Sequence, residues 1–466
     1  MAMTNRHNQK NDCIILDTIE NLVPQDHFIR KLEKAIDWTF VYPLCRPLYS
    51  DIGRPSIDPV VLFKLIFINI LFGYNSMRKT CDECQYNLIY RWFLGLSIYE
   101  DVPNYSTWSQ NYIRRYNDSD VFDQIFSHIL RELDNKGFLD VTTIFGDGTH
   151  QKASANKRKA TDAEVEIAAK HYDQDLLDEI NRSREEHGQK PFDALKKEEI
   201  RFNEATGAEE TAVETKHIKK STTDPESGLY HKGEHEKCFA YGIQTICEAH
   251  GYVLAVDTVP GNVHDSSAFH KPYAETCERY GERVRNVCLD AGYKTPAVCR
   301  EVISNKQKIF TPYKAPMTKK GYMKKSEYSY DEKNDCYVCP QGKVLFYSTT
   351  DRQGYKHYKS RSSDCENCPL KDRCTKSKNN VKDITRHVWA EYSEKAEEYR
   401  YTEEWNTEYP KRKETIERVF GDCKEKSILR YTRVRGLLKN QHQVLMIFAC
   451  HNLKKMAIHK ARCGMI

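Results

Sequence analysis

The sequence predicts an α/β protein: a mixed sheet flanked by helices follows an all-helical N-terminal domain and carries a small cysteine-rich insert. Three observations predict this class. Residues 1–135 place apolar side chains at helical spacing. β-Branched segments appear after residue 140 and alternate with helices. Five cysteines then gather between residues 336 and 374. A chain of 466 residues is long enough for two or three such domains.

The N-terminal domain is expected to be a series of short helices joined by turns. The turn GRPSIDP at residues 53–59 precedes an apolar helix, with Ser56 or Asp58 as its N-cap. Residues 76–93 form a further helix, which Gly95 ends. Such a domain suits either a helix-turn-helix-like DNA-binding module or a helical dimerisation domain, and the sequence leaves both open.

Composition and charge narrow the class of protein. The net charge is only +5, but residues 411–440 hold ten Lys and Arg against four Asp and Glu, which is the kind of local excess that nucleic acid attracts. No secretory signal is visible, and the longest apolar run, residues 60–72, is too short for a membrane span. Seventeen cysteines without a signal suggest reduced thiols. We therefore expect a cytoplasmic protein with no membrane partner.

Two strands of the expected sheet each end at an aspartate that has a glycine close by in the sequence. The strand from Val141 ends at Asp147, and the buried strand from Val284 ends at Asp290. A hairpin over residues 238–260 lies between them in the sequence, and residues 309–313 add a further strand. The very polar residues 152–220 are expected to form a helical insertion in this core.

The cysteine-rich stretch predicts a structural zinc site. Two CxxC pairs about 25 residues apart are followed by a fifth cysteine, and four sulfurs are enough for a closed tetrathiolate site. Which four bind zinc stays open. The candidates are Cys336, Cys339, Cys365, Cys368 and Cys374.

The segment Glu408–Lys426 is expected to form one basic helix with Glu417 as an acid among cations. A glutamate there would repel DNA unless it holds a metal ion. Together with Asp147 and Asp290 it could bind two Mg²⁺ ions, which activate an attacking oxygen and stabilise a leaving one at phosphorus. Neighbouring cations would hold phosphates: Arg412, Lys413, Arg418, Lys424, and the later Arg433 and Arg435.

These segments together resemble the insertion-sequence transposases of the DDE superfamily. Tyr409, Arg412, Glu417 and Lys424 match the family's glutamate helix, Tyr-x2-Arg-(x3 or x4)-Glu-x6-Lys, with the four-residue gap. FGDGTH and CLDAGY look like its two aspartate strands, and TDPESG, PGNVHDS and HNLKK are similar to recurring family phrases. The GRPSIDP…YRWFLGL segment resembles the helical domain of one branch, which also carries a cysteine-rich insert.

The resemblance implies an RNase H-like catalytic core and a DNA transposase. Asp147, Asp290 and Glu417 would hold two Mg²⁺ or Mn²⁺ ions, and Tyr409, Arg412 and Lys424 would position phosphates near the cut. The partners would be double-stranded DNA, both terminal inverted repeats and target, bound by a homodimer.

Residues 1–135 are expected to form the helical domain, and residues 136–335 the first part of the core. Residues 336–374 would form the zinc insert. Residues 375–466 would form the second part of the core, with a closing helix that packs on the sheet. Two alternatives stay open: a catalytically inactive DNA-binding regulator derived from a transposase, and a nuclease of the same fold without strand transfer.

Overall fold

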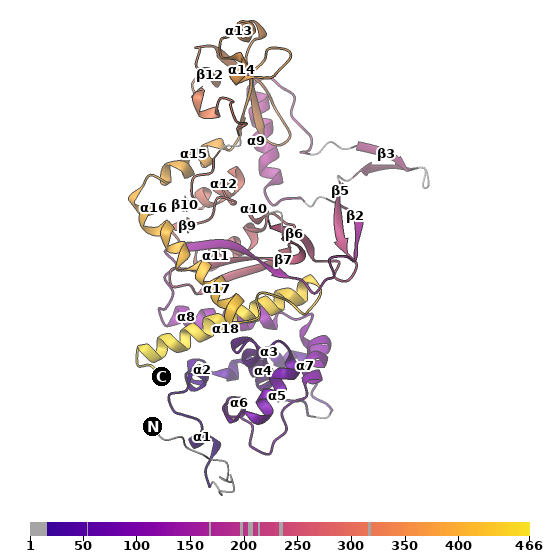
Figure 1. Ribbon diagram of the computed structural model, residues 1–466, viewed down its shortest axis with the longest axis vertical. Coiled ribbons are helices and arrows are strands. Elements are labelled where there is room, and N and C mark those ends of the chain that lie inside the picture. The colour runs from indigo at the N-terminus through magenta and orange to yellow at the C-terminus, as the bar shows by residue number, and fades with distance from the viewer. Residues whose placement is uncertain are drawn as a thin grey trace, which may run out of the picture. The chain divides into compact units, whose positions relative to one another are not determined.

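The chain forms two units, shown in Figure 1. The computed structural model describes residues 16–53, 55–166, 169–195, 199–203, 208–212, 215–232, 236–315 and 318–466. The first unit comprises the described residues up to Phe138, with Gly421–Arg430 and Gln441–Ile466. The second unit comprises Leu139–Phe420 and Tyr431–Asn440. The long helices α17 (Ile416–Lys426) and α18 (Leu437–Arg462) each begin in the second unit and continue in the first.

The N-terminal part of the first unit is helical, as the sequence predicts. Its elements are α1 (Ile19–Leu22), α2 (Phe28–Ala35), η1 (Trp38–Phe40), α3 (Val41–Cys45), η2 (Arg46–Leu48), α4 (Pro59–Leu71), α5 (Met77–Tyr86), α6 (Leu88–Leu94), α7 (Tyr105–Asn111), the π-helix η3 (Tyr112–Tyr116) and α8 (Val121–Asn135). Asp58 is the N-cap of α4, and its carboxylate accepts a hydrogen bond from Val60 N. Gly95 ends α6 with a φ of 73°, a left-handed value that glycine adopts without strain.

The expected helix over residues 76–93 is divided in two. Asn87 is both the C-cap of α5 and the N-cap of α6, where its side chain accepts a hydrogen bond from Ile89 N. Asparagine favours such caps because its side chain competes with the backbone for hydrogen bonds. Within the described part of the chain, no helix is long and apolar enough to cross a membrane.

The closing part of α18 packs with these N-terminal helices. His442 stacks on Phe122 with ring centroids 4.4 Å apart and accepts or donates a hydrogen bond at 2.8 Å with the hydroxyl of Tyr112. Near the other end, Lys460 Nζ donates to the carbonyl oxygen of Ala35 at 2.5 Å. The expectation that this closing helix packs on the sheet stays a prediction.

The second unit is built on a six-stranded mixed sheet in the order β10-β9-β1-β7-β6, with β8 also paired to β7. Its strands are β1 (Thr143–Lys152), β6 (Gly228–Lys232), β7 (Glu236–Glu248), β8 (Val253–Pro260), β9 (Asn286–Cys288) and β10 (Lys308–Phe310). β1 runs antiparallel to β7 and parallel to β9, and β10 is parallel to β9. The helices that accompany this sheet are α10 (Asp265–Ala268), α11 (His270–Tyr280), α12 (Pro296–Ser304), α15 (Ala390–Tyr399) and α16 (Glu403–Glu408).

Asp147 lies inside β1 rather than at its end, so the predicted strand boundary is wrong. β1 continues to Lys152 because β7 pairs with it along its whole length, up to Lys152 opposite Ala240. Flanking glycines suggest a turn in the sequence, but a long antiparallel partner satisfies the backbone groups of an extended chain equally well.

Residues 152–220 contain strands as well as the expected helix. The elements are β2 (Ala160–Glu166), α9 (Asp173–Glu186), β3 (Glu199–Asn203), β4 (Ala208–Ala212) and β5 (Thr215–Ser221). β2 pairs with β5, and β3 pairs with β4. The prediction of a helical insertion is therefore correct only for α9, since cross-strand pairing overrides the helix propensity of charged residues.

The cysteine-rich segment belongs to a second, five-stranded sheet. Its strands are β11 (Ser329–Asp331), β12 (Cys336–Val338), β13 (Val344–Thr350), β14 (Tyr355–Lys359) and β15 (Asp383–His387), paired in chain order. Short helices η4 (Lys325–Glu327), α13 (Ser362–Glu366) and α14 (Lys371–Cys374) accompany it. This sheet extends on both sides beyond the expected insert of residues 336–374. Helix α9 packs against β13, where Ser183 and Thr350 share a hydrogen bond.

The segment Glu408–Lys426 is not one continuous helix. A 3₁₀ helix, η5 (Tyr409–Lys413), follows α16, and α17 starts only at Ile416. Pro410 lies in the first turn of η5, where its missing N–H costs nothing, but it cannot continue the hydrogen bonding of α16. Tyr409 and Lys413 therefore do not share a helical face with Glu417.

Candidate active site

Asp147 lies on β1, and Asp290 follows the end of the neighbouring parallel strand β9. In the register of β1 and β9, Phe145 lies opposite Cys288, and each aspartate comes two residues after one of these paired residues. Neighbouring strands lie about 4.8 Å apart. Both carboxylates are half-buried, and each affects the other electrostatically. The strands thus bring together two acids that are 143 positions apart in the sequence.

The two glycines beside Asp147 are required by close packing. A β-carbon at Gly146 would lie 2.6 Å from Cδ2 of Leu289. A β-carbon at Gly148 would lie 2.6 Å from a carboxylate oxygen of Asp265 and 2.7 Å from Nε2 of Gln244. Any side chain at these positions would push the neighbours of Asp147 away, so the glycines keep the surroundings of the carboxylate closed.

Polar groups around Asp290 form a connected set. The backbone N–H of Gly292 donates to Oδ1 of Asp290 at 2.7 Å. The buried Tyr293 then donates its hydroxyl proton to Oε1 of Gln244 at 2.5 Å, and Nε2 of Gln244 donates to Oδ1 of Asp265 at 2.7 Å. This chain of bonds orients a third carboxylate, Asp265, whose charge acts on Asp147.

Arg412 joins the two aspartate strands. Its guanidinium donates to the carbonyl oxygens of Gly146 at 2.8 Å and Cys288 at 3.2 Å, and to Oδ2 of Asp147 at 2.9 Å. The side chain is buried, with only 6% of its surface exposed. The expected phosphate contact of Arg412 is thus replaced by bonds within the protein, and a DNA contact would require it to leave these partners.

The electrostatics of this region favour a cation. Burial raises the pKa of Asp147 to about 6, and the nearby carboxylates of Asp290 and Asp265 act in the same direction. The Arg412 guanidinium and the N–H of Gly148 oppose that rise in pKa but do not cancel it. A half-buried cluster of acids whose charges repel one another is an environment that a bound divalent cation would relieve.

Glu417 is exposed near the start of α17, five residues after Arg412. The three acids do not meet closely in this conformation. Among the described residues, the single group of three ligand atoms within 4.8 Å of one another is that of His171, His270 and Glu301.

Most predicted DNA contacts are exposed, and Tyr409 and Lys424 are partly buried. Tyr409 is half-buried and stacks on Trp405, with ring centroids 4.9 Å apart. The exposed cations of the second unit are Lys413, Arg418, Arg433 and Arg435, whereas Lys424 is half-buried on α17 in the first unit.

The TDPESG phrase holds the basic loop that carries Arg433 and Arg435. The buried Asp224 accepts hydrogen bonds from Gly436 N at 3.1 Å and from the hydroxyl of Tyr241 at 2.8 Å. Glu226 accepts a hydrogen bond from Leu437 N, the first residue of α18, at 2.6 Å. This motif therefore acts as an anchor for the loop and the start of α18.

Four of the five candidate zinc ligands line the same pocket, and the fifth does not. Cys339, Cys365, Cys368 and Cys374 line one pocket. Cys336 lies on β12, is 6% exposed and is not among the residues that line this pocket.

Sequence reasoning left the most important neighbours of the aspartates undecided or unmentioned. The PGNVHDS phrase contains His264 and Asp265, and its likeness to a family phrase alone assigns neither of them a role. The structure places Asp265 beside Asp147, while His264 caps α10 by accepting from Ser266 N. Gln244 and Tyr293 carry no sequence signal for such a role, because their place in the network depends on strand pairing.

Two family models match parts of the chain. The family model described as Transposase DDE domain matches residues 338–457, a range that includes Arg412 and Glu417. The model described as Transposase domain (DUF772) matches residues 17–114. A comparison with curated proteins finds no match. Both matching models describe transposase domains, and together they support an insertion-sequence DDE transposase.

Proposed function

We propose that this protein is a DNA transposase that cleaves at the ends of an insertion sequence and joins the resulting 3′-hydroxyl ends to target DNA. The observation that carries the proposal is that Asp147 on β1 and Asp290 just after β9 each follow by two residues the paired residues Phe145 and Cys288. The strand order β8-β7-β1-β9-β10, with the first three antiparallel and the last two parallel to β1, supports an RNase H-like core.

The site residues fit a pair of hard divalent cations. Asp147, Asp290 and Glu417 offer carboxylate oxygens, the ligands that Mg²⁺ and Mn²⁺ prefer. When bound, such ions would supply activation of the attacking oxygen and stabilisation of the leaving oxygen. Arg412 would keep the Asp147 carboxylate in place, and α17 would need to bring Glu417 closer than it lies in this conformation.

Exposed cations near Glu417 would bind the DNA backbone. Lys413 and Arg418 flank Glu417 in the sequence, and Arg433 and Arg435 lie on the loop anchored by Asp224. Each phosphate contact adds affinity without reading sequence and makes binding depend on salt. Tyr409 and Lys424 would complete the set that the family motif implies. We also propose that two copies act together on paired DNA ends, and that zinc stabilises the cysteine-rich sheet.

A plasmid assay tests the function directly. The purified chain is incubated with Mg²⁺ and a plasmid that carries terminal inverted repeats, and cleaved and joined products are separated by size. A transposase cuts and joins, a nuclease cuts without joining, and a regulator binds without cutting. The variant Asp290→Ala should bind the ends and cut nothing, while the exposed control Asp162→Ala should behave as the wild type. Cutting by Asp290→Ala at the wild-type rate would remove Asp290 from the site.

A further inference from the structure

The sheet that carries the cysteines has too small a core to be stable through apolar burial alone. The described core cluster of this sheet contains six buried side chains. They are Met323, Tyr328, Tyr337, Leu345, Tyr358 and Ile384. Segments of this size usually need a disulfide, a metal ion or a partner element to hold one structure. Helix α9 covers β13 on one side, which leaves the loops around α13 and α14 to be fixed by something else.

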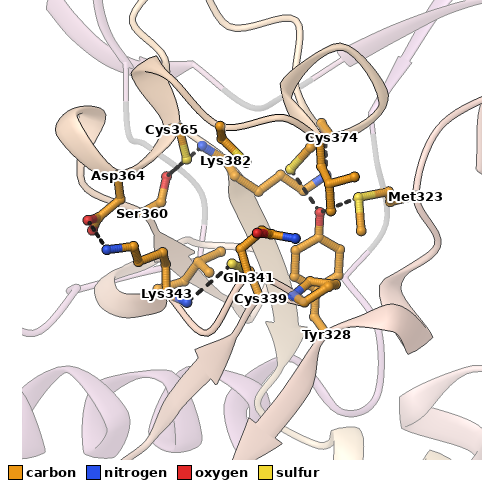
Figure 2. A pocket seen from close by; sticks show the side chains of 14 residues that line it. Met323, Tyr328, Cys339, Gln341, Lys343, Ser360, Asp364, Cys365, Cys374 and Lys382 are labelled. Carbon is orange, nitrogen blue, oxygen red and sulfur yellow. Dashed lines mark hydrogen bonds and ion pairs between the residues drawn. The ribbon is translucent and has the colours of Figure 1, made fainter.

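The four pocket cysteines surround the space between those loops. Figure 2 shows Cys339, Cys365 and Cys374 around one cavity, at the end of the sheet where Tyr328 lies. Cys339 follows β12, Cys365 is on α13, and Cys374 ends α14. The cavity has a volume of about 20 Å³, which is room for about one water-sized particle.

Groups beside the sulfurs are suited to thiolate ligands. The N–H of Lys343 donates to Sγ of Cys339 at 3.3 Å. The hydroxyls of Ser360 and Tyr328 lie 3.2 Å from Sγ of Cys365 and 3.0 Å from Sγ of Cys374. Such outer hydrogen bonds orient metal ligands and offset part of their charge.

Two lysines also line the cavity. Lys382 Nζ donates to the carbonyl oxygen of Cys374 at 2.9 Å, and Lys343 Nζ lies 3.4 Å from Asp364. Four thiolates around a divalent ion leave a net charge of −2. The two ammonium groups offset this charge, and the Asp364 carboxylate beside Lys343 adds one negative charge back, so the site keeps a net charge of about −1.

We infer that Cys339, Cys365, Cys368 and Cys374 bind one structural zinc ion, and that Cys336 is not a ligand. Zinc holds four cysteine sulfurs at about 2.3 Å in a tetrahedron, so neighbouring sulfurs lie about 3.8 Å apart. Among the described residues, no three of these sulfurs lie within 4.8 Å of one another. Binding therefore draws the loops that carry Cys365, Cys368 and Cys374 toward Cys339 and releases the thiol protons.

Metal analysis of the purified full-length chain tests the ligand set. The wild type should carry about one zinc ion per chain, and X-ray absorption should count four sulfur ligands. Serine variants of each pocket cysteine, such as Cys374→Ser, should lose the ion in competition with a chromophoric chelator. The matched control Cys336→Ser should retain it, although this residue belongs to the first CxxC pair.

The outcomes separate the alternatives without using DNA cleavage. Retention of zinc by Cys374→Ser together with its loss from Cys336→Ser would overturn the ligand set. Nitrogen or oxygen ligands in the wild-type absorption spectrum, iron in place of zinc, or a chain without metal would overturn it as well. The sulfur count is measured on the wild type, so it stays decisive even if a serine variant fails to fold. Failure of the plasmid assay would leave the zinc result unaffected.

Discussion

Replacing Arg412 with methionine should destabilise the second unit and disorganise the aspartate pair. Arg412→Met keeps most of the side-chain volume but removes three hydrogen bonds, to Gly146 O, Cys288 O and Asp147 Oδ2. Breaking a buried ion pair by removing one partner costs about 3–5 kcal/mol. Asp147 keeps 20% of its side-chain surface exposed, so water offsets part of this cost, and a loss of about 3 kcal/mol is expected.

The assay uses calorimetry to monitor the thermal unfolding of the full chain. For a unit of this size, a loss of about 3 kcal/mol lowers the melting temperature by about 5–10 °C. The pKa of Asp147 should rise further above about 6 in the variant, because the guanidinium that lowers it is gone. Cleavage in the plasmid assay should fall together with stability.

The neighbouring Lys413 provides the matched control. Its side chain is exposed, so Lys413→Met should leave the melting temperature unchanged. It should instead weaken DNA binding and reduce the salt dependence of that binding by about one charge. If Arg412→Met melted within about 1 °C of the wild type, the buried bonds would not contribute the stability assigned to them.

Three further predictions concern the site, the helical unit and the metal. Gly148→Ala should abolish cleavage because its β-carbon would overlap Asp265 and Gln244. The control Gly421→Ala, whose β-carbon would have nothing within 4 Å, should keep the wild-type melting temperature or raise it slightly. Equal cleavage by both variants would contradict this packing argument. Burial lowers the pKa of His442 to about 4, so the folded protein favours the neutral ring. The free energy of unfolding, which is highest above pH 6.5, should therefore fall by about 3 kcal/mol as the pH drops to 4. His442→Gln should lose this pH dependence in denaturant titrations, and a pH profile unchanged from the wild type would refute the prediction. Treatment with a zinc chelator should lower the melting temperature of wild type and Cys336→Ser alike, and no change in either would argue against a structural ion.

Local patterns in the sequence were sufficient for the elements whose signals lie within a few residues. Asp58 caps α4 and Gly95 ends α6 as predicted, because capping depends on the hydrogen bonds and backbone angles of adjacent residues. The family motif likewise predicted the aspartates and the glutamate from their immediate flanks, and their catalytic role stays a prediction. Pro410 also indicated locally that the helix is interrupted before α17. The regular spacing of charged residues nevertheless led to the prediction of one continuous helix.

Only the tertiary structure decided which distant groups meet. The pairing of β1 with β9 sets the two aspartates side by side, and the burial of Arg412 against them turns an expected phosphate ligand into a support for Asp147. Four of the five cysteines line one cavity because the loops after β12 and around α13 and α14 close on it. The residue type at each position determines the chemistry of its side chain. The partners of that side chain are determined by strand register and packing, which depend on the whole chain at once.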